Sequence, residues 1–271
     1  MTEQRPIKPE SDSGFVLLAP QPTLPAARTL VCFHYAGGSA QAFYPWRAEC
    51  ASRCTLVAAE LPGRGRRPRA PLIGSIVEAA EGFALSYARM PRTEVVFFGH
   101  SLGALVAFET VRAIERMRLP GPERLIVSCR AAPGSGQSLA SLPDLSDAAL
   151  VKYLENLEGT PEAVLKSEAL MKFALPVLRA DLKLIYDYKF SPTPKLNIPI
   201  DVIGTIEDKW APIEVLLEWR RVTHAEFCLR MIPGGHFAPI SSPSLILDLL
   251  GSDRGGAKVG ARRTSLSAPL C

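Results

Sequence analysis

Six short and almost continuously apolar runs alternate along this chain with longer segments of helical periodicity. Strands that are buried on both faces of a parallel sheet carry apolar side chains at nearly every position, and these runs fit that pattern. The alternation therefore predicts an α/β fold with a doubly wound, mostly parallel sheet. The predicted strands are Thr29–Phe33, Thr55–Glu60, Glu94–Phe98, Arg124–Cys129, Ile198–Ile203 and Phe227–Ile232.

Helical patterns fill most of the intervals between these strands, and helices in these places would cover both faces of the sheet. Ser39 is a favourable N-cap residue for the first of them. The predicted helices are Ser39–Ala51, Ile76–Arg89, Leu102–Met117 and Pro212–Thr223.

Nearly seventy residues separate the strand that ends at Cys129 from the strand that begins at Ile198. A single crossover helix does not need so much chain, so we expect an inserted helical lid at about residues 136–195. Two helical patterns lie in this interval, at Ser146–Leu157 and Ser167–Tyr188. Pro176 falls within the second pattern and is expected to kink or split that helix.

The two ends of the chain differ in composition from its centre. Residues 1–27 are rich in proline and polar residues and are expected to be irregular, apart from Phe15–Leu18, which indicates an edge strand. Residues 251–271 are rich in glycine, serine and arginine, which predicts a disordered tail. One α/β domain would then occupy residues 28–250.

Charge and hydropathy narrow the class of protein. The net charge is +4, and three of these charges belong to residues 251–271, so the folded part is nearly neutral. This argues against a nucleic-acid partner, since a nucleic-acid-binding domain carries its basic excess on the fold itself. The N-terminal stretch lacks the apolar core of a signal peptide, and no apolar run approaches the ~20 residues of a membrane helix. We therefore expect a cytoplasmic protein that does not bind membranes.

The six cysteines do not form a pattern of metal ligands. Cys32, Cys129 and Cys228 lie inside apolar runs, where a buried and reduced thiol is expected. Cys50 and Cys54 lack a second pair of ligands at the spacing of a zinc site. No metal site is therefore predicted.

The segment Gly99–Gly103, with the sequence GHSLG, follows one predicted strand and opens a predicted helix. A serine nucleophile uses such a strand–turn–helix context, because the sharp turn lifts its hydroxyl above the sheet. Glycines on both sides allow a turn that is too tight for a Cβ atom. We therefore predict that Ser101 is the nucleophile of a serine hydrolase with the α/β-hydrolase fold.

A serine hydroxyl needs a general base, and the chain has four histidines. His236 lies in the glycine-rich loop Pro233–Phe237 after the last predicted strand, where the α/β-hydrolase order of serine, acid and histidine requires the base. His100 is the neighbour of the nucleophile and points the wrong way, His34 follows the first predicted strand, and His224 precedes the last one. His236 is therefore the predicted base.

The acid that orients this base should follow a strand and precede the histidine in the chain. Asp208 meets both conditions, on the loop after the strand Ile198–Ile203. Glu207, beside it, is the main alternative. Asp187 and Asp201 are weaker candidates, because the first lies in the lid pattern and the second lies inside the strand.

Two backbone N–H groups are needed to stabilise the oxyanion that forms on the substrate. Leu102, directly after the nucleophile, is predicted to supply one of them. The loop His34–Gly38 is predicted to supply the other from Ala36, with Tyr35 as the neighbouring alternative. Glycines in this loop allow the backbone to approach a substrate closely.

Several blocks of sequence resemble the type II thioesterases that accompany nonribosomal peptide and polyketide synthases. The Ala-Gly-Gly, Pro-Gly-Arg and Arg-Ala-Asp blocks are more specific to that family than the serine turn or the histidine loop. The blocks are Cys32–Ser39, Leu61–Arg67, Gly99–Gly103, Leu178–Leu182 and Pro233–Phe237, and Trp46 fits as well. One departure is His34, where the family usually has proline. This histidine neighbours the oxyanion loop without a role, touches the substrate or tunes the pocket.

The resemblance implies a thioesterase that hydrolyses acyl thioesters on the phosphopantetheine arm of acyl or peptidyl carrier proteins. Such enzymes remove stalled or wrongly primed acyl groups. The resemblance also implies that the enzyme has no cofactor of its own, because the substrate carries the phosphopantetheine. Nothing in the sequence demands more than a monomer.

Carrier proteins are acidic around their modified serine, as the same resemblance implies. Arg66 and Arg69 make the loop in which they lie more basic than the family pattern requires, so they are candidate docking residues. Arg64 and Arg67 match the family block and are expected to hold the loop in place instead.

Three other functions remain open on the sequence alone. The same catalytic residues would serve a hydrolase of free small esters or acyl-CoA, or an acyltransferase that passes the acyl group to an amine or alcohol. The third is a non-catalytic module that binds carrier proteins, although the intact Ser101, Asp208 and His236 argue against it.

Overall fold

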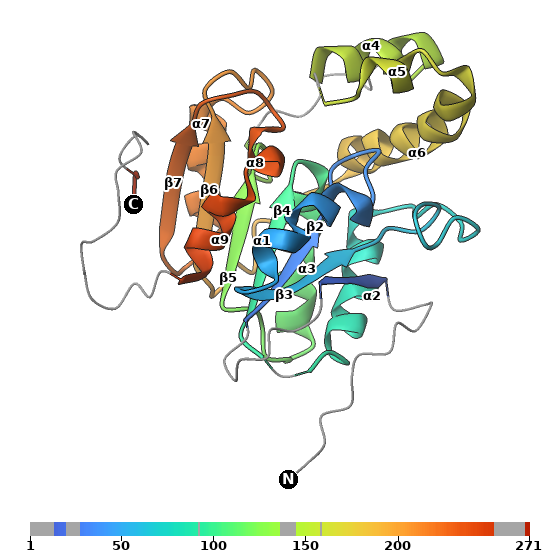
Figure 1. The fold of residues 1–271 in the computed structure, drawn as a ribbon. Coiled ribbons are helices and arrows are strands. Elements are labelled where there is room, and N and C mark those ends of the chain that lie inside the picture. Colours follow the sequence, from blue (N-terminus) through green and yellow to red (C-terminus); the bar gives the residue numbers. More distant parts are fainter. Residues whose placement is uncertain (1–13, 20–27, 92, 136–144, 158, 252–268) are drawn as a thin grey trace.

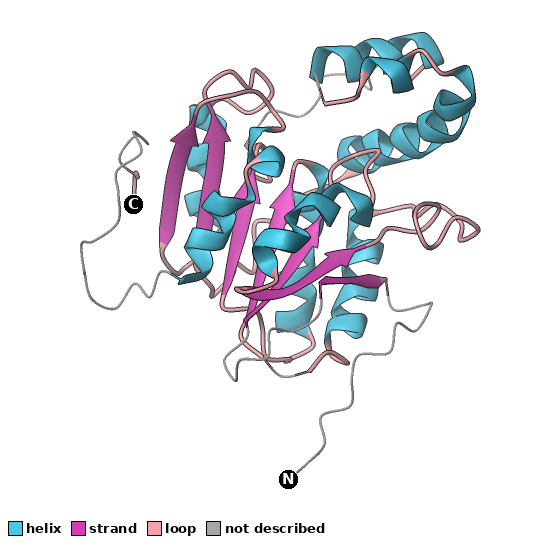
Figure 2. Ribbon diagram, viewed as in Figure 1, coloured by secondary structure: helices cyan, strands magenta, loops and turns pink. Residues whose placement is uncertain are grey.

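A seven-stranded sheet forms the centre of the structure, a computed structural model that describes residues 14–19, 28–91, 93–135, 145–157, 159–251 and 269–271. The strand order is β1-β3-β2-β4-β5-β6-β7. β1 is antiparallel to β3, and the other neighbouring strands are parallel (Figures 1 and 2). The strands are β1 (Phe15–Ala19), β2 (Arg28–Phe33), β3 (Cys54–Ala59), β4 (Val95–His100), β5 (Arg124–Ser128), β6 (Ile200–Thr205) and β7 (Phe227–Ile232).

The burial of the strands explains their continuous apolar runs. Every residue of β3, β4 and β6 is buried, because helices cover both faces of the sheet. The six strands predicted from these runs are confirmed, with ends that differ by no more than two residues, and β7 coincides with its predicted range. The short apolar run near the N-terminus forms β1 at the edge of the sheet, as expected.

Two groups of helices pack on the two faces of the sheet, and each group shares a hydrophobic core with it. One group consists of α2 (Ile76–Tyr87), α3 (Leu102–Arg116), α7 (Ile213–Leu217) and the 3₁₀ helix η2 (Glu218–Val222). The other consists of the 3₁₀ helix η1 (Ala40–Trp46), α1 (Arg47–Cys50), α8 (Ala238–Ser241) and α9 (Pro243–Gly251). In the described ranges, no helix combines the length and apolarity of a membrane span.

The first predicted helix begins as expected but has a different geometry. The side chain of Ser39 caps it by accepting a hydrogen bond from the N–H of Gln41 at 3.3 Å. The segment then forms η1, a 3₁₀ helix, before one short turn of α-helix in α1. Pro45 lies inside η1 and has no N–H group for an α-helical hydrogen bond, which favours the tighter form here.

Three helices form a lid at the end of the sheet toward which the parallel strands point (Figure 1). They are α4 (Asp147–Leu157), α5 (Glu162–Leu165) and α6 (Glu168–Asp187), and α4 and α6 share a small core of their own. Residues 136–144, at the start of the predicted lid interval, lie outside the described residues. The helices α4 and α6 match the two helical patterns of the sequence, whereas the four-residue α5 was not predicted.

Of the two effects expected of Pro176, the split of the second lid helix is wrong, because α6 runs through it without interruption, and the kink stays a prediction. Pro176 lies on the exposed side of α6, and so does Lys172, four residues earlier. The carbonyl group of Lys172 loses its hydrogen bond to an N–H at position 176, but it is on the side where water can replace that bond. The helix therefore tolerates the proline.

Two predictions for the C-terminal segment need correction. Cys228, expected to be a reduced thiol, forms a disulfide with Cys271. Leu270 and Leu229 exchange two backbone hydrogen bonds of 2.9 Å, so residues 269–271 lie in order beside β7 and are not part of a disordered tail. Residues 252–268 of the predicted tail lie outside the described residues. Composition alone does not predict this contact, because the contact depends on the outer edge of β7.

Candidate active site

Ser101 lies at the turn between β4 and α3 with φ 55° and ψ −117°, a strained backbone for a residue with a side chain. The glycines around it make the turn feasible. A Cβ atom on Gly99 would lie 2.6 Å from the Cα of Ala104, and one on Gly103 would lie 2.1 Å from the carbonyl oxygen of Phe33. Glycine at both positions lets β4 and α3 meet closely, so the strand–turn–helix context predicted for the serine is present.

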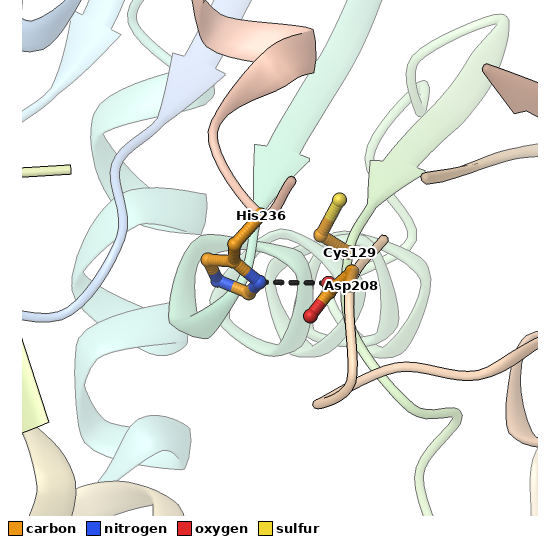
Figure 3. A group of neighbouring side chains, drawn as sticks. All are labelled: Cys129, Asp208 and His236. Atoms are coloured by element: carbon orange, nitrogen blue, oxygen red, sulfur yellow. Dashed lines mark hydrogen bonds and ion pairs between the residues drawn. The ribbon is translucent and has the colours of Figure 1, made fainter. Parts of the chain in front are cut away.

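His236 and Asp208 face one another from the loops that follow β7 and β6 (Figure 3). Nδ1 of His236 lies 2.8 Å from Oδ2 of Asp208, and both side chains are buried. Because an ionised carboxylate only accepts hydrogen bonds, the proton belongs on Nδ1, which leaves Nε2 free to act as a base. The other carboxylate oxygen, Oδ1, accepts a hydrogen bond of 2.9 Å from the N–H of Trp210. The acid is thus held on both of its oxygens.

The other acids considered for this role are engaged or exposed elsewhere. Glu207 is exposed, although it neighbours Asp208 in the chain. Asp187 is also exposed and pairs with Lys183 on α6. Asp201 is buried within β6 and forms ion pairs with two arginines, Arg124 and Arg230. Among the described acids weighed from the sequence, Asp208 is the one bonded to the imidazole of His236.

The thiol of Cys129 lies beside this pair, at the end of β5 (Figure 3). Its Sγ is 3.7 Å from the hydroxyl of Thr205, and burial together with the nearby Asp208 raises the pKa of the thiol well above its usual value. The ligand atoms of Cys129, Asp208 and His236 all lie within 4.8 Å of one another, a spacing that a metal ion could use. However, the hydrogen bond between His236 and Asp208 already engages two of these atoms, and the thiol is held protonated. We therefore interpret the cluster as an acid–base pair with a neighbouring thiol.

His100, the residue before the nucleophile, has a supporting place in the site. Its Nδ1 lies 2.8 Å from the hydroxyl of Ser128, and its ring centroid is 5.0 Å from that of His236. Burial lowers the pKa of His100 well below its usual value, and the nearby His236 lowers it further. A neutral, enclosed imidazole fits the expectation that this histidine is not the base.

The loop predicted to hold the oxyanion contains a tight turn. The N–H of Gly38 donates to the carbonyl of Tyr35 at 3.0 Å, and Gly37 has a positive φ of 75°. A negative φ at Ala36 followed by a positive φ at Gly37 is the pattern of a type II turn, which favours glycine at the second of these positions. The N–H of Ala36 donates to no acceptor in the part of the chain that the structure describes.

The second predicted oxyanion donor adjoins this turn. Leu102 is the first residue of α3, so its N–H has no carbonyl one turn earlier in the helix. A Cβ atom on Gly103 would lie 2.6 Å from the carbonyl oxygen of His34, which shows how closely the first turn of α3 approaches the loop. Within the described ranges neither N–H group donates to an acceptor, and the two groups come from adjacent segments. Which of Ala36 and Tyr35 supplies the loop donor stays a prediction.

His34 is a buried link between two loops. Its Nδ1 lies 2.9 Å from the carbonyl of Tyr35, and its Nε2 accepts a long hydrogen bond of 3.5 Å from the N–H of Leu61. Burial and the positive charge of Arg64 lower the pKa of His34 to about 4, so the imidazole is neutral near pH 7. The contacts favour the interpretation that it supports the oxyanion loop and does not touch a substrate.

The arginines of the loop after β3 divide into two kinds. Arg64 is buried and forms a bidentate ion pair with Asp181 of α6, with distances of 2.5 and 2.8 Å. Arg67 is half-buried and donates to the carbonyl of Glu60 at 3.3 Å. Arg66 and Arg69 are exposed. The structure thus agrees with the expectation that Arg64 and Arg67 hold the loop, and it leaves Arg66 and Arg69 free to meet a partner.

The lid contacts the loops that carry Asp208 and His236. The ring of Tyr153 in α4 packs edge-on against Trp210, two residues after the acid, with 5.6 Å between ring centroids. Between α4 and α5, Gly159 lies against Phe237, since a Cβ atom there would be 2.0 Å from that ring. The lid therefore rests directly on the loops that carry Asp208 and His236.

Comparison with known proteins gives the family. A model of the thioesterase domain matches residues 28–252. The chain belongs to the thioesterase domain family. Among curated relatives, it is 38% identical to thioesterase PikA5 of Streptomyces venezuelae over 83% of this chain and 80% of that protein. It is 33% identical to the gramicidin S biosynthesis protein GrsT of Aneurinibacillus migulanus over 77% of this chain and 81% of that protein.

Solved structures of thioesterases share the fold. The type II thioesterase BorB from the borrelidin biosynthetic cluster superimposes with a TM-score of 0.79 at 33% identity, over 90% of this chain and 98% of BorB. The type II thioesterase YbtT from the yersiniabactin pathway gives a TM-score of 0.77 at 31% identity, over 88% of this chain and 96% of YbtT. The predicted thioesterase family and the predicted α/β-hydrolase fold are both confirmed.

Some contacts of the site had no direct signal in the sequence. The Arg-Ala-Asp block contributes to the resemblance, but nothing in its sequence indicates that Asp181 reaches the loop His34–Gly38. Cys129 was expected to be buried, but its position beside Asp208 depends on the pairing of β5 with β6. Both contacts join residues far apart in the chain, and local patterns do not record such pairs.

Proposed function

We propose that this thioesterase is of the type II kind and hydrolyses acyl thioesters on the phosphopantetheine arm of carrier proteins in polyketide or nonribosomal peptide synthesis. The observation that carries the proposal is the buried 2.8 Å contact between His236 and Asp208, in a chain whose strained Ser101 follows a strand of the same sheet. The relatives GrsT, BorB and YbtT, by their names, support the biosynthetic setting.

In the proposed reaction, Ser101 is the nucleophile and His236 is the general base. Nε2 of His236 takes the proton of the serine hydroxyl while Oγ attacks the thioester carbonyl, and Asp208 stabilises the imidazolium that results. The tetrahedral adduct collapses, the C–S bond breaks, and the imidazolium gives its proton to the departing pantetheine thiol. Water then attacks the acyl-enzyme with the same proton transfers, which releases the acid and restores the serine.

The oxyanion of each tetrahedral adduct would accept hydrogen bonds from the N–H groups of Leu102 and Ala36. Neither group donates to an acceptor among the residues that the structure describes, so both could serve an oxyanion. The chemistry needs no metal and no cofactor of the enzyme, since the pantetheine thiol is part of the substrate.

An acidic carrier protein would dock beside this site. Arg66 and Arg69 are exposed on the same loop as Arg64, which is anchored to the lid helix α6. The loop therefore presents two positive charges next to the lid. We propose that the enzyme acts on its carrier proteins as a cytoplasmic monomer, and size-exclusion chromatography with light scattering measures its oligomeric state.

Mass spectrometry of intact carrier proteins tests the proposal. A panel of acetyl-, butyryl-, malonyl- and aminoacyl-carrier proteins is incubated with the enzyme, with Ser101→Ala as the control. Loss of the acyl mass from the carrier, with a free acid as product, supports the proposal. Hydrolysis of acyl-CoA or aryl esters with no action on any carrier would overturn it, and transfer of the acyl group to an added amine would identify an acyltransferase.

A further inference from the structure

The carboxylate of Asp181, in the lid helix α6, is completely buried and reaches the oxyanion loop. Its Oδ2 accepts a hydrogen bond of 2.8 Å from the N–H of Gly37. Both of its oxygens also accept from Arg64, at 2.5 and 2.8 Å. One lid residue is thus bonded both to the turn that carries the predicted oxyanion donor and to the loop after β3.

The peptide that Asp181 holds is the central one of the turn. In a type II turn the peptide between the second and third residues, here Ala36 and Gly37, is flipped relative to a type I turn. The N–H of Gly37 belongs to that peptide, so the hydrogen bond to Asp181 fixes which way it faces. The orientation of this peptide sets ψ of Ala36 and φ of Gly37, and thereby the type of the turn. The preceding peptide of the same turn carries the N–H of Ala36, the predicted donor.

Packing and a further polar contact reinforce the arrangement. Leu178, one turn before Asp181 on α6, lies over Gly37, since a Cβ atom on Gly37 would be 3.4 Å from its side chain. Ala36 packs against the small core of the lid. Arg64 also donates to the carbonyl of Gly38 at 3.3 Å. The helix and the turn therefore form one packed unit with a buried ion pair at its centre.

We infer that Asp181 is a positioning residue for the oxyanion hole. It acts through Gly37, by keeping the turn in the conformation that leaves the N–H of Ala36 directed to the substrate, and the two hydrogen bonds from Arg64 hold its carboxylate in place. The inference rests on the proposed catalytic role of the loop. It assigns to the lid helix a part in the chemistry, separate from any contact with the acyl chain.

The test compares Asp181→Ala and Asp181→Asn with the wild-type enzyme on a small aryl thioester and on an aryl boronic acid, which forms a tetrahedral adduct with the serine. Asp147→Asn is the matched control, because Asp147 pairs with Arg179 on the exposed surface of the same lid. We expect Asp181→Ala to lower kcat by about 10²-fold, as the loss of an oxyanion donor does, with a KM changed less than threefold. Affinity for the boronic acid should fall by a similar factor.

A structural role alone would give a different result. If Asp181→Ala lowered the melting temperature but left kcat and boronic acid affinity within threefold of wild type, the inference would be overturned. Asp181→Asn, nearly equal in shape, serves if the alanine variant does not fold, and it should fall between wild type and the alanine variant in both measurements. An unchanged kcat in a folded asparagine variant, together with unchanged boronic acid affinity, also contradicts the inference. Neither assay uses a carrier protein, so a failure of the proposed carrier substrate would be seen separately.

Discussion

His236 and Asp208 meet at 2.8 Å although 28 positions separate them in the chain, because β7 and β6 are parallel neighbours whose loops leave the same edge of the sheet. Parallel strands bring their carboxyl ends together, and the fold uses this property to place an acid beside a base. Ser101, which directly follows β4, lies at the same edge of the sheet.

Asp208→Asn should reduce kcat for an aryl thioester on the order of 10⁴-fold, because an amide at this position favours the wrong tautomer of His236 and cannot stabilise the imidazolium. The matched control is Glu207→Gln, since Glu207 is adjacent in sequence but exposed. Steady-state kinetics at pH 7.5 make the comparison. Equal losses in the two variants would refute the assignment of the acid.

Gly103→Ala should destabilise the protein by about 1–3 kcal/mol and abolish most activity, because the new Cβ would lie 2.1 Å from the carbonyl oxygen of Phe33, which belongs to the backbone of the sheet. For Gly82→Ala, within α2, we expect stability to change in the opposite direction. A Cβ atom there meets nothing within 4 Å, so alanine should stabilise the helix by about 0.5–1 kcal/mol. Urea unfolding measures both, and similar signs for the two substitutions would contradict the explanation.

Stability should fall with acidification partly because of His34. Its pKa is about 4 in the folded protein against an ordinary value of 6.5, since burial and Arg64 disfavour the imidazolium. Above pH 6.5 both states hold the neutral ring, so the shift has no effect there. Between pH 6.5 and 4 only the unfolded chain binds the proton, which costs about 3 kcal/mol of stability in total.

The variant His34→Gln should therefore show a flatter dependence of unfolding free energy on pH over this window. His224→Gln is the control, because His224 is exposed. The buried His100, whose pKa is also lowered, remains in both variants, so the slope should shrink without vanishing. A slope that is the same in wild type and His34→Gln would show that the imidazole at position 34 takes up its proton in the folded state.

The double variant Arg66→Glu and Arg69→Glu reverses the exposed charges of the loop. It should raise KM for an acyl-carrier protein by tenfold or more. The kinetics on a small aryl thioester should stay unchanged. Docking between opposite charges weakens with salt, so the wild-type KM should rise with ionic strength more steeply than that of the variant. Arg89→Glu, on an exposed position after α2, is the control for a charge reversal away from this loop. An unaltered KM for the carrier in the double variant would disprove docking at this loop.

Local patterns were sufficient to predict the sheet and to single out Ser101, His236 and Asp208, whose catalytic roles stay predictions. The buried strands need continuous apolar runs, and Ser101 and His236 lie in loops whose glycines mark them in the sequence. The choice of Asp208 over Glu207 also followed from position in the loop, and the structure distinguishes them by burial.

The sequence could not predict contacts that depend on the three-dimensional neighbourhood. Arg64 and Asp181 are 117 positions apart, and their pairing depends on where α6 crosses the oxyanion loop. The helix-breaking effect expected of Pro176 was offset by its exposed place on α6. The disulfide of Cys228 required knowledge that Leu270 pairs with the edge of β7.

That pairing at β7 has a consequence for self-association. An outermost strand offers unpaired N–H and C=O groups to any other extended chain, and this is a common route to aggregation. Leu270 satisfies such groups on Leu229, and the Cys228–Cys271 bond fastens the short segment there. If the disulfide were reduced, only the short backbone pairing would hold this segment on the edge strand. The resistance of this enzyme to forming intermolecular sheets should therefore depend on the redox state of its surroundings.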